Sequence, residues 1–98
     1  MAVISIREYE QMGDSSGGAL QVAREPAVAA QSLAVGGGSV ASNAFNVRCR
    51  YIRVQTDVRC SLDFGAAPTA TATSCTLAAG ATEYFAVTAG HKVAVIAA

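Results

Sequence analysis

Hydrophobic and polar residues alternate along most of this chain, with the period of two that is typical of a β-strand with one buried face. The pattern begins near the N-terminus, where Ile4 and Ile6 share one parity and Ser5 and Arg7 share the other. Residues 2–9 are therefore predicted to form a short strand. No stretch of the chain follows a helical period more closely than it follows this one.

The strongest alternation covers residues 52–64. Apolar side chains occupy one parity, namely Ile52, Val54, Val58, Cys60, Leu62 and Phe64. Polar side chains occupy the other, namely Arg53, Gln55, Arg59, Ser61 and Asp63. One face of this segment is therefore predicted to be buried and one to be polar, with a bend, bulge or tight turn at Thr56 and Asp57.

Several shorter strands are predicted around this segment. Residues 31–35 and 40–45 are expected to form a hairpin across the glycines at 36–38, and residues 65–73 a loop. Strands at 74–77, 83–87 and 92–96 are expected to be separated by turns at 78–81 and 88–91. The predicted inward residues of these elements are Phe45, Leu77, Phe85, Val87, Val93 and Val95. Seven or eight short strands at this spacing indicate an all-β fold, a small β-sandwich of jelly-roll type.

The segment that follows the first strand has a different character. Residues 12–18 contain three glycines and are expected to form a loop. Residues 21–30 are rich in alanine around Pro26 and fit either a loose helix or an extended arm, of which we favour the arm. The predicted organisation is an N-terminal strand and Gly/Ala-rich arm at 1–30, followed by the sandwich at 31–98.

The amino-acid composition predicts a thin hydrophobic core. Of the 98 residues, 21 are Ala and 9 are Gly, so a large part of the hydrophobic share of 52% is alanine, which has little area to bury. A domain of this size also buries a smaller share of its surface than a larger one does. Its edges, filled with small uncharged residues, are of the kind that invite pairing with another chain. We therefore expect a homo-oligomer, either a dimer or a trimer.

Charge is sparse and balanced. Charged residues make up 14% of the chain and the formal net charge is zero, which gives no reason to expect nucleic acid or an anionic membrane as partner. No apolar run approaches the roughly 18 residues that span a bilayer. The N-terminal residues lack the pattern of a secretion signal, so synthesis in the cytoplasm is expected.

Few side chains are suited to chemistry. His91 is the only histidine, and no nucleophile or carboxylate is predicted beside it. Because Asp57, Asp63 and Glu83 lie on different predicted elements, they suggest neither a glycosidase pair nor a calcium loop. The prediction is a protein that is not an enzyme, with no catalytic, cofactor-binding or metal-binding residues.

Three cysteines, Cys49, Cys60 and Cys75, are spaced by 11 and 15 positions. This spacing fits neither a zinc pattern nor a disulfide framework. We interpret them as small buried hydrophobic residues. A single disulfide bridge and a metal site remain as alternatives.

The candidate contact residues fall into two groups. The first group contains four of the chain's seven basic residues, Arg48, Arg50, Arg53 and Arg59. They form either a solvated sheet face or a set of guanidinium groups that bind carboxylates of a partner in bidentate fashion. In the N-terminal strand, Ile4, Ile6 and Tyr9 are candidates for contact with a partner by strand addition.

Residues 51–96 contain motifs that resemble the C-terminal half of small virion proteins of tailed bacteriophages. The first motifs are a strand ending in Phe64 and Gly65, the loop Pro-Thr-Ala-Thr at 68–71 and the turn Leu-Ala-Ala-Gly at 77–80. The aromatic pair Tyr84 and Phe85 follows, and the closing Gly-His-Lys-Val-Ala-Val-Ile at 90–96 completes the set. The resemblance covers about half of the chain, and the N-terminal 30 residues have no counterpart in it.

The resemblance implies a structural protein of the virion. The expected role is a decoration or cement protein on the capsid exterior, with the major capsid protein and further copies of itself as partners. Neither nucleic acid nor a membrane is an expected partner. The alternative is a receptor- or carbohydrate-binding module of a tail or fibre, in which the tyrosines Tyr9, Tyr51 and Tyr84 supply the aromatic surface.

Overall fold

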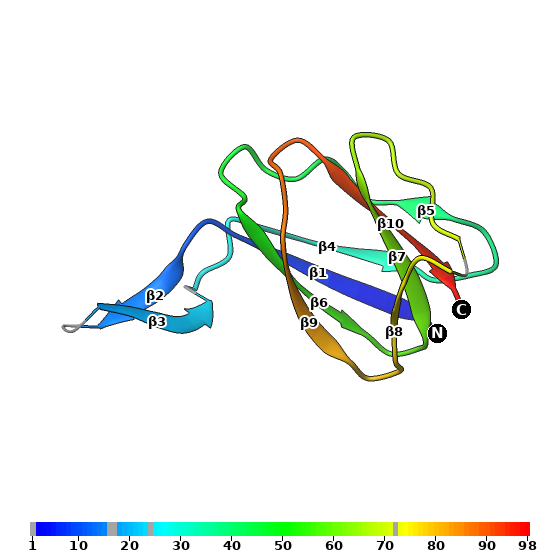
Figure 1. Cartoon of the computed structure of the whole chain (residues 1–98), viewed down its shortest axis with the longest axis horizontal. Coiled ribbons are helices and arrows are strands. Elements are labelled where there is room, and N and C mark those ends of the chain that lie inside the picture. Colours follow the sequence, from blue (N-terminus) through cyan, green and yellow to red (C-terminus); the bar gives the residue numbers. More distant parts are fainter. Residues whose placement is uncertain (1, 16–17, 24, 72) are drawn as a thin grey trace.

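The computed structural model describes residues 2–15, 18–23, 25–71 and 73–98, and all regular elements within these ranges are β-strands. Two four-stranded sheets pack face to face, and a separate two-stranded hairpin projects from one end of them (Figure 1). Every pairing is antiparallel. The predicted all-β class is therefore confirmed.

The two sheets draw their strands from distant parts of the sequence. In order across sheet 1, the strands are β4 (Ala29–Ala34), β1 (Val3–Tyr9), β6 (Tyr51–Thr56) and β9 (Thr82–Ala86). In order across sheet 2, they are β5 (Val40–Ala41), β10 (Lys92–Ala97), β7 (Cys60–Gly65) and β8 (Cys75–Leu77). The projecting hairpin consists of β2 (Met12–Ser15) and β3 (Gly18–Ala23).

The core lies between the two sheets and contains the side chains that the alternation predicts. From sheet 1 the buried residues are Ile4, Ile6, Ile52 and Val54, and from sheet 2 they are Cys60, Leu62, Leu77, Val93 and Val95. Phe45 is also buried, as predicted, while Val58, Phe64, Phe85 and Val87 pack against the core with part of their surface exposed. The period of two therefore places the inward residues of β1, β6, β7 and β10 correctly.

The predicted bend at Thr56 and Asp57 is where the chain crosses from sheet 1 to sheet 2. Thr56 is buried, and its hydroxyl donates a hydrogen bond of 2.7 Å to the carbonyl oxygen of Val58. A carboxylate oxygen of Asp57 accepts a hydrogen bond of 2.8 Å from the backbone N–H of Val3. Where the strand pairing ends, these side chains supply hydrogen-bond partners to backbone groups that the β-ladder no longer pairs.

Two of the predicted turns depend on glycine. Gly80 and Gly90 have φ angles of 78° and 84°, a conformation that side chains with a Cβ atom rarely adopt. They lie in the connections that precede β9 and β10 respectively. The turns predicted at 78–81 and 88–91 are confirmed.

The hairpin predicted for residues 31–35 and 40–45 is wrong. β5 contains only Val40 and Ala41, and it pairs with β10 in sheet 2. The neighbour of β4 is β1, with Ile4 opposite Leu33. The glycines at 36–38 thus lie where the chain crosses from β4 in sheet 1 to β5 in sheet 2, because Val40 and Ala41 pair with β10 and not with β4.

The N-terminal part of the chain also differs from the prediction. The loop expected at 12–18 is largely the β2–β3 hairpin, although Ser16 and Gly17 lie outside the described residues. β1 is an inner strand between β4 and β6, and the division expected after residue 30 falls inside β4. The structure has ten strands in its described ranges, where seven or eight were expected.

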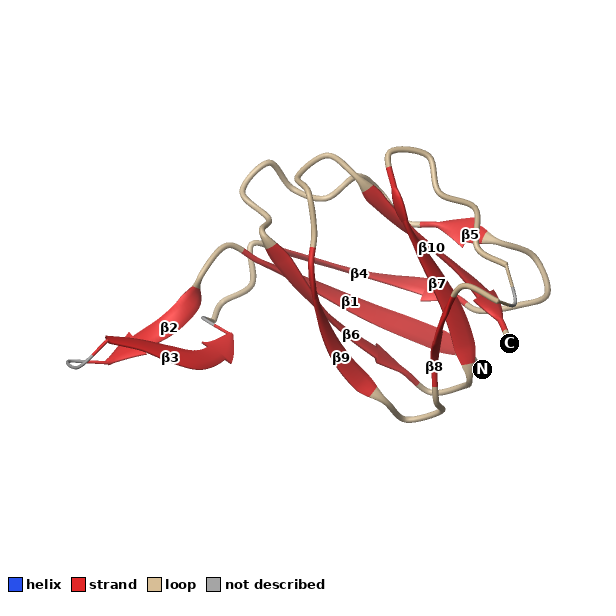
Figure 2. Ribbon diagram, viewed as in Figure 1, coloured by secondary structure: helices blue, strands red, loops and turns tan. Residues whose placement is uncertain are grey.

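The β2–β3 hairpin extends away from the sandwich, as Figure 2 shows. Its pairing register shifts between Met12 and Asp14. The phenol of Tyr51 in β6 donates a hydrogen bond of 2.8 Å to the carbonyl oxygen of Gln11 and so ties the base of the hairpin to sheet 1. Since a two-stranded hairpin is marginally stable alone in water, this tie at its base is structurally important.

Candidate functional site

The face of sheet 1 that points away from the core gathers polar and aromatic side chains from all four strands. We call it the outer face of sheet 1. The strand register places on it Ala30, Ser32 and Ala34 of β4; Val3, Ser5, Arg7 and Tyr9 of β1; Tyr51, Arg53 and Gln55 of β6; and Thr82, Tyr84 and Ala86 of β9. Because cross-strand neighbours share a face, residues far apart in sequence, such as Ser5 and Gln55, become adjacent here.

Three tyrosines form a row on this face. The rings of Tyr9 and Tyr51 are stacked, with centroids 5.3 Å apart and an angle of 19° between their planes. The rings of Tyr51 and Tyr84 are tilted by 43°, with centroids 6.3 Å apart. Tyr9 is fully buried whereas Tyr84 is 51% exposed. The row therefore runs from the base of the hairpin to open surface at β9.

The buried end of the row is fastened by an ion pair. Tyr9 donates a hydrogen bond of 2.7 Å from its phenol to Glu25, and Arg7 lies 3.1 Å from the other carboxylate oxygen of Glu25. Arg7 also donates to the phenol oxygen of Tyr9 at 3.2 Å. The hydrogen bond from Tyr9, with help from Arg7, lowers the pKa of Glu25, while burial raises the pKa of Tyr9. This cluster anchors the chain where it returns from the hairpin.

Arg53 lies in the middle of the outer face without such a partner. The register places it opposite Arg7 on β1 and opposite Tyr84 on β9. Among the described residues, Arg53 has no carboxylate within ion-pair distance. Two guanidinium groups directly opposite each other on one face repel, and Glu25 neutralises only one of them. The local balance of Arg7, Arg53 and Glu25 leaves one positive charge.

A shallow cavity of about 360 Å³ lies beside Arg53 on this face. Its polar lining includes Ser5, Arg7, Ser32, Arg53 and Gln55. These groups offer hydroxyl, amide and guanidinium donors to an acceptor that enters from outside. The site is therefore suited to a carboxylate or a similar polar group of a partner. The exposed ring of Tyr84 does not line this cavity but lies on the other side of Arg53, on β9.

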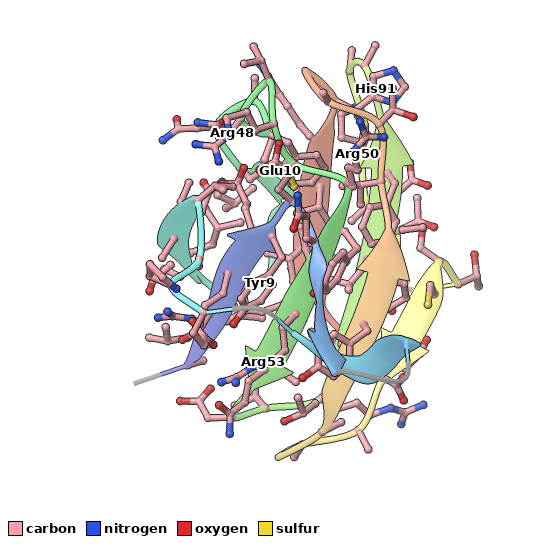
Figure 3. The ribbon with its side chains drawn as sticks, turned by 90° about the vertical axis from the view of Figure 1, so that its left-hand side faces the viewer. Tyr9, Glu10, Arg48, Arg50, Arg53 and His91 are labelled. Atoms are coloured by element: carbon pink, nitrogen blue, oxygen red, sulfur yellow. The ribbon has the colours of Figure 1, made fainter. Side chains whose placement is uncertain are left out.

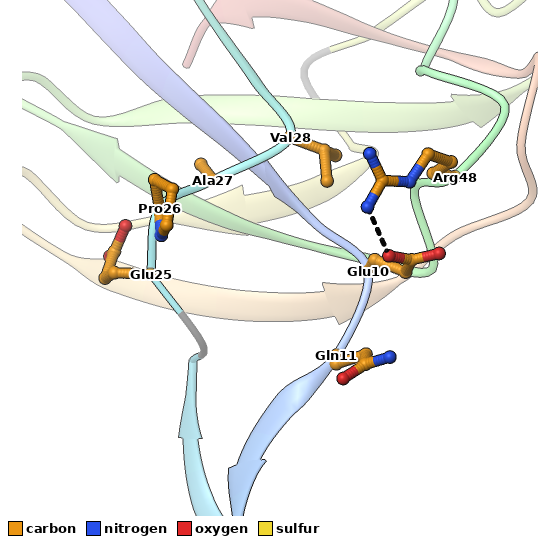
Figure 4. Close-up of a pocket in the computed structure, with 7 residues that line it drawn as sticks. All are labelled: Glu10, Gln11, Glu25, Pro26, Ala27, Val28 and Arg48. Carbon is orange, nitrogen blue, oxygen red and sulfur yellow. Dashed lines mark hydrogen bonds and ion pairs between the residues drawn. The ribbon is translucent and has the colours of Figure 1, made fainter.

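A second hollow, of about 580 Å³, lies between the base of the hairpin and the sandwich (Figure 4). On one side of it Arg48 and Glu10 form an ion pair at 2.8 Å, which lowers the pKa of Glu10 and raises that of Arg48. On the other side lie Glu25 and Pro26, whose peptide bond is cis. Since the guanidinium of Arg48 is already engaged by Glu10, this hollow offers less unpaired charge than the outer face does.

The four arginines that cluster in the sequence do not form one patch in space. Arg48 pairs with Glu10, and Arg53 lies on the outer face of sheet 1, apart from Arg48 and Arg50 (Figure 3). Arg59 directly precedes β7 in the opposite sheet, where its carbonyl oxygen accepts from the N–H of Ala98. Of the four, Arg53 is the one that the fold places beside an exposed aromatic ring.

The contact candidates in the first strand have no surface in this structure. Ile4, Ile6 and Tyr9 are each fully buried, and β1 is paired on both sides, by β4 and by β6. They hold the core and the base of the hairpin together. A strand with neighbours on both sides has no free edge to add to another chain's sheet.

Glu8 is a structural residue that the sequence interpretation missed. It is 3% exposed, and its carboxylate accepts hydrogen bonds from the backbone N–H of Asn46 at 2.6 Å and from the side-chain amide of Gln31 at 3.3 Å. Burial, with the nearby charge of Glu8 as a smaller cause, raises the pKa of Cys49 to about 11. The signal was available, because Glu8 has the same parity as Ile4 and Ile6.

The cysteines and His91 do not assemble into a reactive centre. Cys49 and Cys60 are buried, as predicted, but Cys75 is exposed because β8 is a short strand at the edge of sheet 2. All three are free thiols. His91 lies in the turn before β10, where its carbonyl oxygen accepts from the N–H of Phe45 at 2.8 Å. Among the described residues, no three His, Cys, Asp or Glu side chains lie together as a metal site.

Comparison with known proteins finds no similar protein. No protein-family model, no curated protein and no solved structure matches this chain. Within the described ranges, there is also no helix of the length and apolar character needed to cross a membrane. The geometry of the outer face and the sequence motifs are therefore the basis of the functional proposal.

Proposed function

We propose that this chain is a structural protein of a tailed-bacteriophage particle, which binds the exterior of the capsid and stabilises the shell as a decoration or cement protein. Its partners are the major capsid protein and further copies of itself. It is made in the host cytoplasm and acts in the virion, without enzymatic activity, cofactor, nucleic acid or membrane. The support is the resemblance of residues 51–96 to such proteins together with the surface chemistry of sheet 1.

The observation that carries the proposal is the pairing of Arg53 with Tyr84 on the outer face. Arg53 has a guanidinium group without a carboxylate partner among the described residues, and Tyr84 is half exposed beside it on the next strand. Arginine and tyrosine are enriched among the residues that contribute most to protein interfaces. The proposed capsid contact is a carboxylate that binds Arg53 and displaces water from the ring of Tyr84.

We propose further that the sandwich is a jelly roll with an arm. The eight strands of the sandwich can be numbered from β4 as the first to β10 as the seventh, with β1 as the eighth. Sheet 1 then has the order first, eighth, third, sixth, and sheet 2 has the order second, seventh, fourth, fifth. Nested strands of this kind are typical of the jelly roll, which is common in viral capsid proteins. In this reading the last strand position is taken by the N-terminal strand β1, and the arm is the β2–β3 hairpin inserted after it.

The proposed mechanism is mass action. A protein that binds the assembled shell but not its free subunits shifts the equilibrium away from disassembly. One interface of ordinary size, about 1,600 Å² in total, is enough when it repeats around a symmetric particle. The rigid sandwich is suited to this role because its contact residues are held by strand pairing and keep their geometry when free.

The test uses particles that lack this chain, prepared from a phage deletion, to which the purified protein is added back. We expect the wild-type chain to bind the heads and to raise their midpoint of disassembly in a mild chaotrope. Arg53→Ala and Tyr84→Ala should each lose this effect, while Arg59→Ala, which removes an arginine from the other sheet, should keep it. Binding of the wild-type chain to tails alone, or stabilisation by all variants alike, would contradict the proposal.

A second function has one observation in its favour. An exposed tyrosine flanked by polar groups is also the usual platform for a sugar ring, and Tyr84 has Arg53 and Gln55 on the neighbouring strand. A receptor- or carbohydrate-binding module of a tail or fibre would present such a face. A glycan array that gives clear hits with the wild-type chain and none with Tyr84→Ala would favour this function over the capsid role.

A further inference from the structure

The edge strand β4 lacks the features by which edge strands normally avoid other chains. It runs for six residues, Ala29–Ala34, at one border of sheet 1. It contains no charged residue and no proline, and Ala30, Ser32 and Ala34 are exposed. Natural edges are usually short, charged, bulged or interrupted by proline.

The other three edges are protected. β5 has two residues and β8 has three, so neither offers a long template. β9 has five residues, but these include the charged Glu83 and the bulky, exposed Tyr84. Among the described sheet edges of the sandwich, β4 is thus the one that is long, uncharged and made of small side chains.

The hydrogen-bonding groups of β4 that face outward can be assigned from the register. The N–H of Val35 donates to the carbonyl oxygen of Ala2, and Ile4 pairs with Leu33. In an antiparallel ladder the backbone groups of successive residues point to opposite sides. The odd-numbered residues of β4 therefore bond to β1, and the N–H and C=O groups of Ala30, Ser32 and Ala34 point away from the sheet.

The three residues whose backbone groups point outward, Ala30, Ser32 and Ala34, are symmetric about Ser32. A second copy that pairs antiparallel with β4 therefore places Ser32 opposite Ser32 and Ala30 opposite Ala34. No side chain in the row clashes with its counterpart, and serine hydroxyls opposite each other can form a hydrogen bond. The formal net charge of the chain is zero, so no net charge opposes the approach of two copies.

We propose that two copies of this chain pair through β4, antiparallel about a two-fold axis at Ser32, to form one continuous eight-stranded sheet from two copies of sheet 1. This dimer would be the homo-oligomer of the proposed function, and to that extent the inference rests on the proposed function. The dimer can be tested without a capsid. Strands this short bury less area than a standard interface, so the dimer is weak in dilute solution. On a particle, the pair joins two outer faces and gains from multivalent binding.

The first test is the substitution Ser32→Pro. The N–H of Ser32 points away from β1, so proline at this position keeps the pairing inside the sheet and removes a donor from the dimer axis. The matched control is Thr82→Pro, at an outward-pointing position of β9, the opposite edge of sheet 1. Sedimentation velocity over a concentration series should show self-association for the wild-type chain and for Thr82→Pro, and loss of self-association for Ser32→Pro.

The second test fixes the register and does not depend on how proline is tolerated. In a Cys75→Ser background, which removes the exposed thiol, Ser32→Cys should form a disulfide-linked dimer on mild oxidation, because directly opposite residues lie within disulfide distance. Ala30→Cys and Ala34→Cys should link to each other when mixed, and each should link poorly to itself.

The outcomes separate this proposal from the proposed function. A wild-type chain that stays monomeric at the highest concentrations, or a Ser32→Cys variant that links no better than Ala30→Cys, overturns the β4 pairing. Neither result affects whether the chain binds phage heads. A chain that dimerises through Ser32 but binds no head would support the pairing while contradicting the capsid role.

Discussion

Arg7 and Arg53 face each other across the β1–β6 ladder, on the same outer face of sheet 1. Arg7 is paired with Glu25 at 3.1 Å, whereas Arg53 has no carboxylate partner among the described residues. Like charges placed directly opposite destabilise a sheet. The position of Arg53 therefore costs stability in the free chain, and a carboxylate supplied by a partner would remove that cost.

Replacing Arg53 by glutamate should separate stability from binding. Arg53→Glu turns a repulsive cross-strand pair with Arg7 into an attractive one, which should raise the free energy of unfolding by roughly 0.2–1 kcal/mol. The same change should abolish binding to phage heads, because it puts a negative charge where a partner's carboxylate is proposed to bind. Urea unfolding and head co-sedimentation measure the two effects. A variant that is less stable and still binds would contradict this view of Arg53.

Acidification should weaken the hairpin base. The pKa values of Glu10 and Glu25 are lowered from the ordinary 4.5, so their contribution to stability is complete above that pH and is lost as the pH falls through the lowered values in the folded state. Urea midpoints should therefore fall below about pH 4.5, and less steeply in Glu10→Gln and Glu25→Gln. Because these ion pairs are exposed, molar salt should reduce the effect in the wild-type chain. An unchanged pH profile in both variants would rule out these pairs as its source.

The three cysteines should react at different rates with a thiol-specific reagent. Cys75 is exposed and should react in the folded protein. Cys49 is buried with its pKa raised to about 11, so little thiolate is present near neutral pH, and Cys60 is buried as well. One thiol should titrate before unfolding and the rest after it. Cys75→Ser should remove the early reaction, and persistence of that reaction in this variant would place an accessible thiol elsewhere.

Truncating Ile6 should show whether the first strand serves the core or a partner. Ile6 is fully buried between the sheets, so Ile6→Ala should cost about 2–5 kcal/mol of unfolding free energy. Val47→Ala, at a position that is 87% exposed, should change it by less than about 0.5 kcal/mol. Thermal or urea unfolding measures both. If Ile6→Ala unfolds like the wild-type chain and only loses partner binding, Ile6 is a contact residue and not part of the core.

Local alternation was sufficient to predict which residues face inward. Ile52, Leu62, Val93 and Val95 are buried as expected, because a strand puts successive side chains on opposite faces wherever it lies. The break at Thr56 and the turns with Gly80 and Gly90 follow from equally local chemistry. The same pattern would also have placed Glu8 on the inner face, had it been applied to charged residues.

The pairing of strands was not available from the same pattern. The predicted return of residues 40–45 onto the preceding strand fails because Val40 and Ala41 pair with β10, far away in the sequence, in the opposite sheet. The exposure of Cys75 depends on β8 being a short strand at a sheet edge. The candidate site is likewise a product of register, since Arg53 meets Arg7 and Tyr84 through two different neighbouring strands.

The sequence by itself determined an all-β chain with little charge, because composition and the period of two are properties of each segment alone. Only the tertiary structure decided that the arginines separate, that Ile4 and Ile6 are buried in the middle of a sheet, and that β4 is left as an open edge. The physical reason is that antiparallel pairing joins segments of any separation, and which pairs form depends on the packing of the whole core.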